Sequence, residues 1–163
     1  MTPDSYLIVV AELAVGIIGF AGIIAAIQRR GLSQLPGLHV VWLQILLGAE
    51  AAAIVFALFP FVLAAANVPS NTIWVVGSFA TLVWYVIVGS IRKRQSAKLG
   101  TGVKIPTVNF IWVAIICILQ SYNIILGGEP WPYLIAVFGL VANGFMAFVL
   151  LLLSPGDLDE PST

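Results

Sequence analysis

Long apolar stretches alternate with short polar ones along the chain. The longest, residues 38–66, runs for about 29 residues without a Lys, Arg or Asp. An α-helix rises about 1.5 Å per residue, and a bilayer core needs roughly 20 apolar residues, so this stretch can cross a membrane. The pattern predicts an all-α, polytopic integral membrane protein whose other helices cover this one. The protein is expected to have five transmembrane helices, at about residues 6–28, 38–66, 73–91, 106–126 and 131–153.

The polar breaks indicate a single membrane domain, residues 1–153, with no separate soluble domain. Asn67–Asn71 is typical of a turn, and Asn71 or Thr72 is expected to cap the third helix. Pro60 falls inside the second apolar stretch, where it either kinks the helix or ends it, leaving residues 61–66 at the membrane interface. The acidic segment 154–163 is expected to be a disordered cytoplasmic tail.

The basic residues predict how the protein is oriented. All seven lie in residues 29–30 and 92–104, and with five spans both segments fall on the same side of the membrane. The positive-inside rule makes that side cytoplasmic, so the N-terminus is expected outside and the C-terminus inside. We expect a multi-pass protein of the cell membrane, or of the inner membrane if the source is bacterial.

Composition supports the membrane assignment, because 61% of the residues are hydrophobic, only 9% are charged and the mean hydropathy is +1.09. Soluble domains are about 25% charged. The formal net charge of zero gives no reason to expect a nucleic-acid partner. The lipid bilayer is the expected environment of most of the surface.

Two acids at membrane depth are the main candidates for chemistry. Glu50 is near the middle of the second apolar stretch and Glu12 lies in the first. An ionised carboxylate there costs on the order of 3 kcal/mol, so such residues usually face a bundle interior or a wet cavity. Either Glu50 handles protons or cations, or it is a neutral group that donates a hydrogen bond to a neighbouring helix. His39 precedes it by eleven residues, roughly 16 Å of helix, which is too far for contact but suits a relay.

Further polar residues recur at helical spacing in the fourth stretch. Gln120 and Asn123 share a face there and are expected at a depth similar to that of Glu12, so the three could cluster. They are candidates for an ion or proton path, or for hydrogen bonds between helices. Gly16, Gly19 and Gly22 in the first stretch are typical of a helix-packing face, because small residues let backbones approach closely in lipid.

The sequence contains no pair of Cys or His residues for a metal or haem, no phosphate-binding loop and no hydrolase motif. We therefore expect no enzyme activity, no cofactor and no metal. Two functions remain open. One is a homo-oligomeric channel or ion/proton-coupled transport protein using Glu50 and Glu12. The alternative is a non-catalytic accessory or scaffold subunit that packs against partner membrane proteins or lipid.

Overall fold

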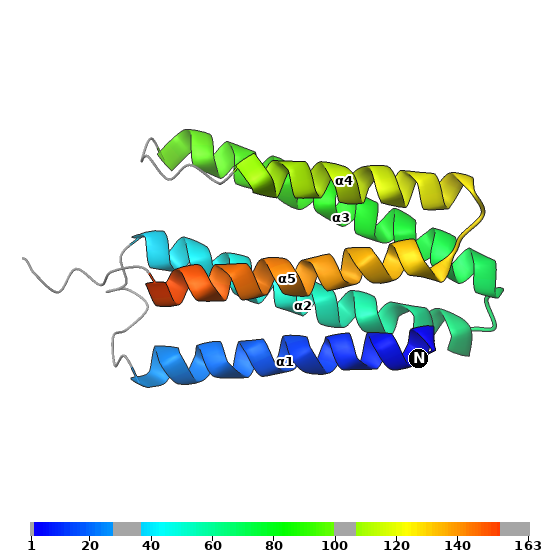
Figure 1. Ribbon diagram of the computed structural model, residues 1–163, viewed down its shortest axis with the longest axis horizontal. Coiled ribbons are helices and arrows are strands. Elements are labelled where there is room, and N and C mark those ends of the chain that lie inside the picture. Colours follow the sequence, from blue (N-terminus) through cyan, green and yellow to red (C-terminus); the bar gives the residue numbers. More distant parts are fainter. Residues whose placement is uncertain (1, 28–36, 100–106, 154–163) are drawn as a thin grey trace, which may run out of the picture.

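The computed structural model describes residues 2–27, 37–99 and 107–153, and within these ranges every regular element is an α-helix. This confirms the all-helical prediction. The expected tail, 154–163, lies outside the described residues, as do the basic residues 29–30. The helices, drawn in Figure 1, are α1 (Pro3–Ile27), α2 (Gly37–Ala65), α3 (Ser70–Leu99), α4 (Thr107–Ile125) and α5 (Pro130–Leu153).

The bounds of two helices are informative. α3 begins at Ser70, before the expected caps, and continues to Leu99, eight residues beyond the predicted end of the span. Residues 92–99 contain no Gly or Pro and are mostly good helix formers, so the basic segment extends the helix instead of starting a loop. α2 continues through Pro60 to Ala65, which excludes a helix end at the proline.

Consecutive helices run in opposite directions (Figure 1). The start of α1, the α2–α3 turn and the α4–α5 turn therefore lie together at one end of the bundle, called here the N-terminal end. The basic extension of α3 lies at the opposite end, where α1 also ends and α4 begins.

Four helices are long and apolar enough to cross a membrane, within α1, α2, α3 and α5. The apolar part of α4, Ile111–Ile125, is shorter. The whole of α4 has 19 residues, which corresponds to roughly 28 Å of helix, close to the thickness of a bilayer core. The structure thus supports a membrane-embedded protein with several apolar helices.

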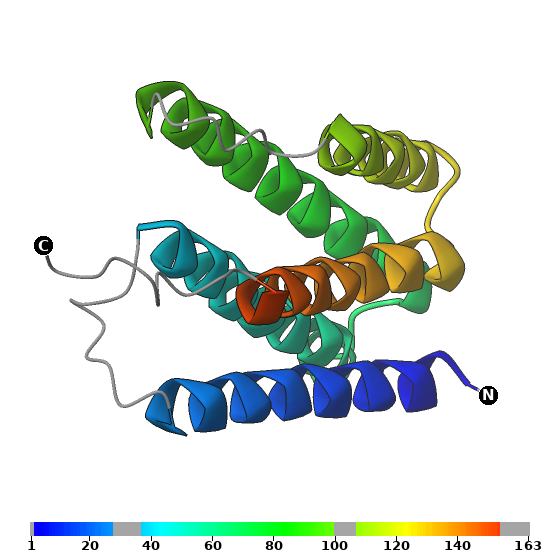
Figure 2. The same ribbon diagram turned by 60° about the vertical axis from the view of Figure 1, so that its left-hand side comes forward.

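α5 is the central helix, since it packs against each of the other four, whereas α2 packs mainly on α1, α3 and α5. The expectation that the other helices cover α2 is met by three of them, whereas α4 packs mainly on α3 and α5. Figure 2 shows α1 on one side of α5 and the α3–α4 pair on the other. Two apolar clusters fill the interior, a large one towards the N-terminal end around Phe56 and Val137, and a smaller one around Trp42 and Leu46.

Candidate functional site

Glu50 lies in the gap between these two apolar clusters and is fully buried. It is eight residues from Trp42 and fifteen from Ala65, the ends of the apolar segment of α2, so it lies deep within the membrane region. Neither carboxyl oxygen has a hydrogen-bond partner among the described residues. Buried polar groups are normally paired, and unpaired ones at membrane depth are characteristic of functional sites.

The space for the Glu50 carboxyl is provided by Gly144 on α5. A Cβ atom added at Gly144 would lie 2.6 Å from Cδ and 2.9 Å from Cγ of Glu50, which is closer than atoms can approach. Only glycine therefore allows α5 to pass this close to an extended acid. Alanines on α2 on either side, Ala49 and Ala53, are also buried, so small residues surround the carboxyl along both helices.

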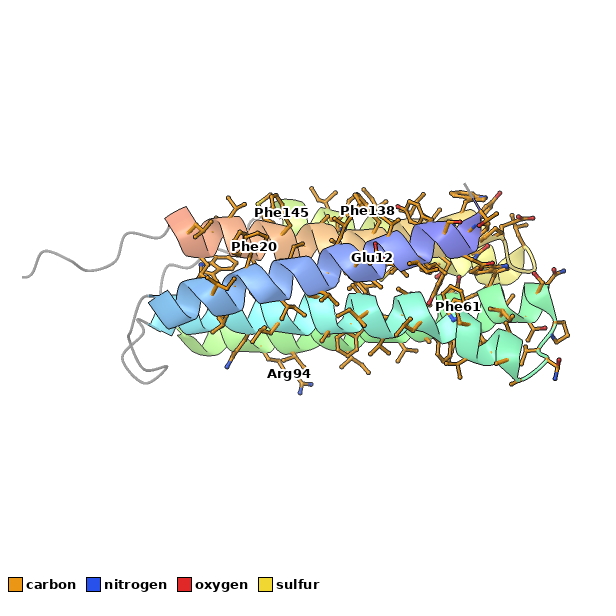
Figure 3. All side chains as sticks on the ribbon, turned by 90° about the horizontal axis from the view of Figure 1, so that it is seen from below. Glu12, Phe20, Phe61, Arg94, Phe138 and Phe145 are labelled. Carbon is orange, nitrogen blue, oxygen red and sulfur yellow. The ribbon has the colours of Figure 1, made fainter. Side chains whose placement is uncertain are left out.

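Glu12 has the opposite environment. It lies near the middle of the apolar segment Pro3–Ile23 of α1 and its side chain is exposed, on the side of the bundle seen in Figure 3. Gly16 and Gly19 continue the same exposed face, and a Cβ atom added at either would meet nothing within 4 Å. This face, defined by Glu12, Gly16, Gly19 and Ile23, is called the Glu12 face. Gly22 flanks it, and a Cβ atom added there would also meet nothing within 4 Å.

Gln120 belongs to a hydrogen-bonded network between α3, α4 and α5. Its side-chain amide donates to the carbonyl of Pro132 at 2.7 Å, and its side-chain oxygen lies 3.4 Å from the hydroxyl of Thr81. The Thr81 hydroxyl also lies 3.0 Å from the carbonyls of Gly77 and Ser78. The side chains of Gln120, Thr81 and Pro132 are all buried. The amide of Gln120 on α4 thus connects this helix to both α3 and α5.

Asn123 closes the α4–α5 turn. Its amide nitrogen donates to the Ser78 hydroxyl at 2.8 Å and to the Glu129 carbonyl at 2.9 Å, and its oxygen accepts from the Glu129 backbone N–H at 2.7 Å. The turn itself passes through Gly127 and Gly128, both with φ near +90°, a conformation that favours glycine. The polar groups of Asn123 are thus used to hold the turn against α3.

A third polar contact replaces a backbone hydrogen bond that is missing from α2. Pro60 has no N–H, so the carbonyl of Phe56, four residues earlier, loses its usual helical partner. The hydroxyl of Tyr133 on α5 donates to that carbonyl. Gly77 makes room for the tyrosine ring, because a Cβ atom there would lie 2.8 Å from Cε2 of Tyr133. Backbone groups in a membrane must be satisfied inside the protein, which explains this arrangement.

The predicted candidates are therefore separated in space. α1 and α4 lie on opposite sides of the bundle in both views (Figures 1 and 2), so Glu12 does not cluster with Gln120 or Asn123. The position of the His39 side chain lies outside the described residues, although its backbone belongs to the first turns of α2.

Sequence reasoning missed Gly144 and Tyr133. For Tyr133 a signal exists, since Pro60 implies an unpaired carbonyl at Phe56, but the donor is identified only by packing. Within the described ranges no three His, Cys, Asp or Glu residues lie close enough to hold a metal ion. Comparison with family models, curated proteins and solved structures gave no match to this chain.

Proposed function

We propose that this chain is a five-span membrane protein that handles protons or cations through Glu50 and assembles from several copies of itself. One observation carries the proposal: a fully buried carboxyl deep in the apolar region has no hydrogen-bond partner among the residues described. A carboxyl used only for packing or hydrogen bonding would be expected to have a donor or acceptor beside it. A proton or cation that binds and leaves requires a group without a permanent partner.

The Glu12 face supports assembly. An ionised carboxylate that faces lipid in the middle of a span costs on the order of 3 kcal/mol. A second copy of the chain, packed on the same face, would remove Glu12 from lipid and let the backbones approach at Gly16 and Gly19. Self-association suits a carboxyl in particular, because two carboxyl groups can share a proton or bond to each other.

The remaining parts of the proposal follow from the sequence. Five spans and a cytoplasmic C-terminus agree with the alternating helix directions and with the basic extension of α3 at one end. Gln120 and Asn123 need no transport role, because their hydrogen bonds already account for their burial. We propose no enzymatic activity, no cofactor and no nucleic-acid partner.

The test of Glu50 is flux in proteoliposomes, measured with a pH-sensitive dye inside and with Na⁺ or K⁺ gradients. Glu50→Gln keeps the size of the side chain and should abolish flux. Glu129→Gln is the matched control, since it removes an exposed acid from the α4–α5 turn, and should retain flux. Equal flux in wild type and Glu50→Gln would refute the role of the acid.

The test of assembly is the mass of the protein in nanodiscs. The double substitution Gly16→Leu and Gly19→Leu should leave each copy folded, because nothing lies near either position, but should disrupt the oligomer. Gly48→Leu is the control, as Gly48 is also exposed and free of contacts but lies on α2. A mass unaffected by the double substitution would exclude the Glu12 face as the contact.

The second candidate function is an accessory or scaffold subunit. It is favoured by the same Glu12 face, if the surface that covers it belongs to a different membrane protein. In that case the wild-type protein alone would carry no flux and would have the mass of a monomer.

A further inference from the structure

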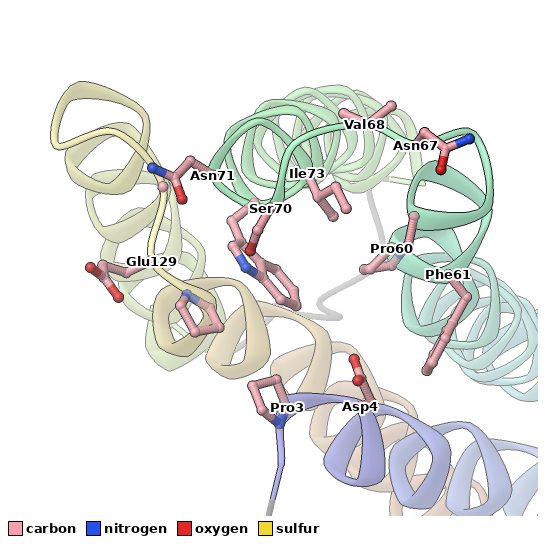
Figure 4. A pocket seen from close by; sticks show the side chains of 14 residues that line it. Pro3, Asp4, Pro60, Phe61, Asn67, Val68, Ser70, Asn71, Ile73 and Glu129 are labelled. Carbon is pink, nitrogen blue, oxygen red and sulfur yellow. The ribbon is translucent and has the colours of Figure 1, made fainter.

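A pocket of about 800 Å³ opens at the N-terminal end of the bundle. Its walls come from the start of α1, the end of α2, the start of α3 and the α4–α5 turn (Figure 4). Four apolar segments begin or end here, so the pocket lies where the membrane region meets water. The volume is within the range of about 300–1,000 Å³ that small-molecule sites occupy.

The lining mixes apolar and aromatic side chains with polar and acidic ones, which are Asp4, Asn67, Ser70, Asn71 and Glu129. Pro60, Phe61, Ile73 and Trp74 form much of the wall. Pro60 and Ile73 are buried, so this part of the wall belongs to the packed interior of the bundle. Sites for small organic molecules pair an apolar and aromatic wall with polar groups that fix the orientation of the ligand.

The charge of the pocket is negative. In Figure 4 the carboxylate of Asp4 points from α1 into the space between α2 and α3, whereas that of Glu129 points away from it. No lining residue is basic, and the basic residues 92–94 and 98 lie on α3 at the far end of the bundle. The Asp4 side chain is exposed and has no ion pair or hydrogen bond in the described part of the chain, so its charge is accessible to a ligand.

We propose that this pocket binds an organic cation with an apolar body, such as a quaternary ammonium or phosphonium group. The Asp4 carboxylate supplies the counter-charge, and Trp74 and Phe61 supply aromatic faces, which attract cations through their quadrupoles. The same chemistry is offered by a free lipophilic cation and by the choline headgroup of a lipid. The proposal is independent of Glu50, which lies ten residues before Pro60 on α2, about 15 Å of helix.

The experiment is equilibrium binding to the purified full chain in maltoside micelles, with empty micelles as the blank. Tetraphenylphosphonium is the probe and tetraphenylborate is its matched anion, with the same shape and the opposite charge. We expect saturable binding of the cation and little binding of the anion. Equal binding of both ions would overturn the proposal.

Three variants locate the site. Asp4→Asn and Trp74→Leu should each weaken cation binding about three- to tenfold, the range for a partly exposed ion pair or cation–π contact. Glu129→Gln, which removes the same charge from the same end, should change it less than about twofold because its carboxylate points away. Thermal unfolding of each variant reports whether the fold is intact. Binding that is insensitive to Asp4→Asn in a folded variant, or as sensitive to Glu129→Gln, would refute this site.

Competition identifies the source of the cation. Displacement of the probe by short-chain phosphatidylcholine, but not by the matching phosphatidylglycerol, would assign the pocket to a lipid headgroup. Saturable binding that neither lipid displaces would assign it to a free organic cation. Glu50→Gln should leave the binding unchanged, so that failure of this inference and failure of the transport proposal are distinguishable.

Discussion

The contact between Tyr133 and α2 gives the sharpest prediction from the packing. Tyr133→Phe removes only the hydroxyl, while the ring stays against Gly77 and at a centroid distance of 5.8 Å from Trp74. The loss leaves the Phe56 carbonyl buried without a donor, because Pro60 has no N–H to offer. An unpaired buried acceptor costs about 1–3 kcal/mol, and measured hydrogen bonds between membrane helices average ~0.6 and reach ~1.7 kcal/mol. We expect Tyr133→Phe to lower the free energy of unfolding by about 1–1.5 kcal/mol.

Replacing Pro60 tests whether the proline is the reason why the Phe56 carbonyl depends on Tyr133. In a Pro60→Ala background the new N–H at position 60 can bond to the Phe56 carbonyl, as in any helix. The cost of Tyr133→Phe should then fall below about 0.5 kcal/mol, giving a coupling energy near 1 kcal/mol between positions 60 and 133.

The assay is equilibrium unfolding in mixed micelles with increasing denaturing detergent, followed by circular dichroism for all four members of the double-mutant cycle. Tyr85→Phe is the control, because the Tyr85 hydroxyl donates to the Ala136 carbonyl at 2.9 Å, four residues before Leu140, which has its own N–H. Its cost should be the same in both backgrounds within about 0.5 kcal/mol. An equal cost of Tyr133→Phe with and without Pro60 would refute the reasoning.

Two further substitutions test the other packing sites by the same unfolding assay. Gly144→Ala should destabilise the protein by about 1–3 kcal/mol, because the added Cβ would lie 2.6 Å from Cδ of Glu50, and most of this cost should disappear in a Glu50→Ala background. An undiminished cost would mean that Gly144 is required for another reason. Asn123→Ala should cost about 1–3 kcal/mol, since the Glu129 N–H and the Ser78 hydroxyl lose their partner, whereas Tyr122→Ala, at an exposed neighbouring position, should cost less. Equal costs would show that the turn does not depend on this amide.

The helices could be predicted from the sequence because lipid leaves the backbone few alternatives. A long apolar segment must form its hydrogen bonds within itself, so its length and hydropathy largely determine the helix. The end of α3 could not be found in this way. Hydropathy falls at Arg92, whereas the helix depends on backbone propensity and continues to Leu99.

The candidate acids could also be recognised from the sequence, but their environments could not. Glu50 and Glu12 both appear as acids within apolar stretches, yet Glu50 is fully buried and Glu12 is exposed. The difference depends on which face of each helix meets a neighbour. Apolar residues lie on all sides of these helices, so their periodicity gives little information about which face is packed against a neighbour. The pairing of Glu50 with Gly144 depends further on the register between α2 and α5, which no local pattern determines.

The distribution of polar partners gives the strongest reason to place function at Glu50. Gln120 and Asn123 hold neighbouring elements together, because each side-chain amide both donates and accepts a hydrogen bond. A glutamine at position 50 would fill nearly the same volume beside Gly144 as glutamate does. A carboxyl differs from that amide chiefly in its ability to release and rebind a proton, or to hold a cation. The described residues offer Glu50 no bond that a glutamine would miss, so Glu50→Gln isolates the ability of the acid to exchange a proton or hold a cation, and loss of flux in that variant is what the proposed function predicts.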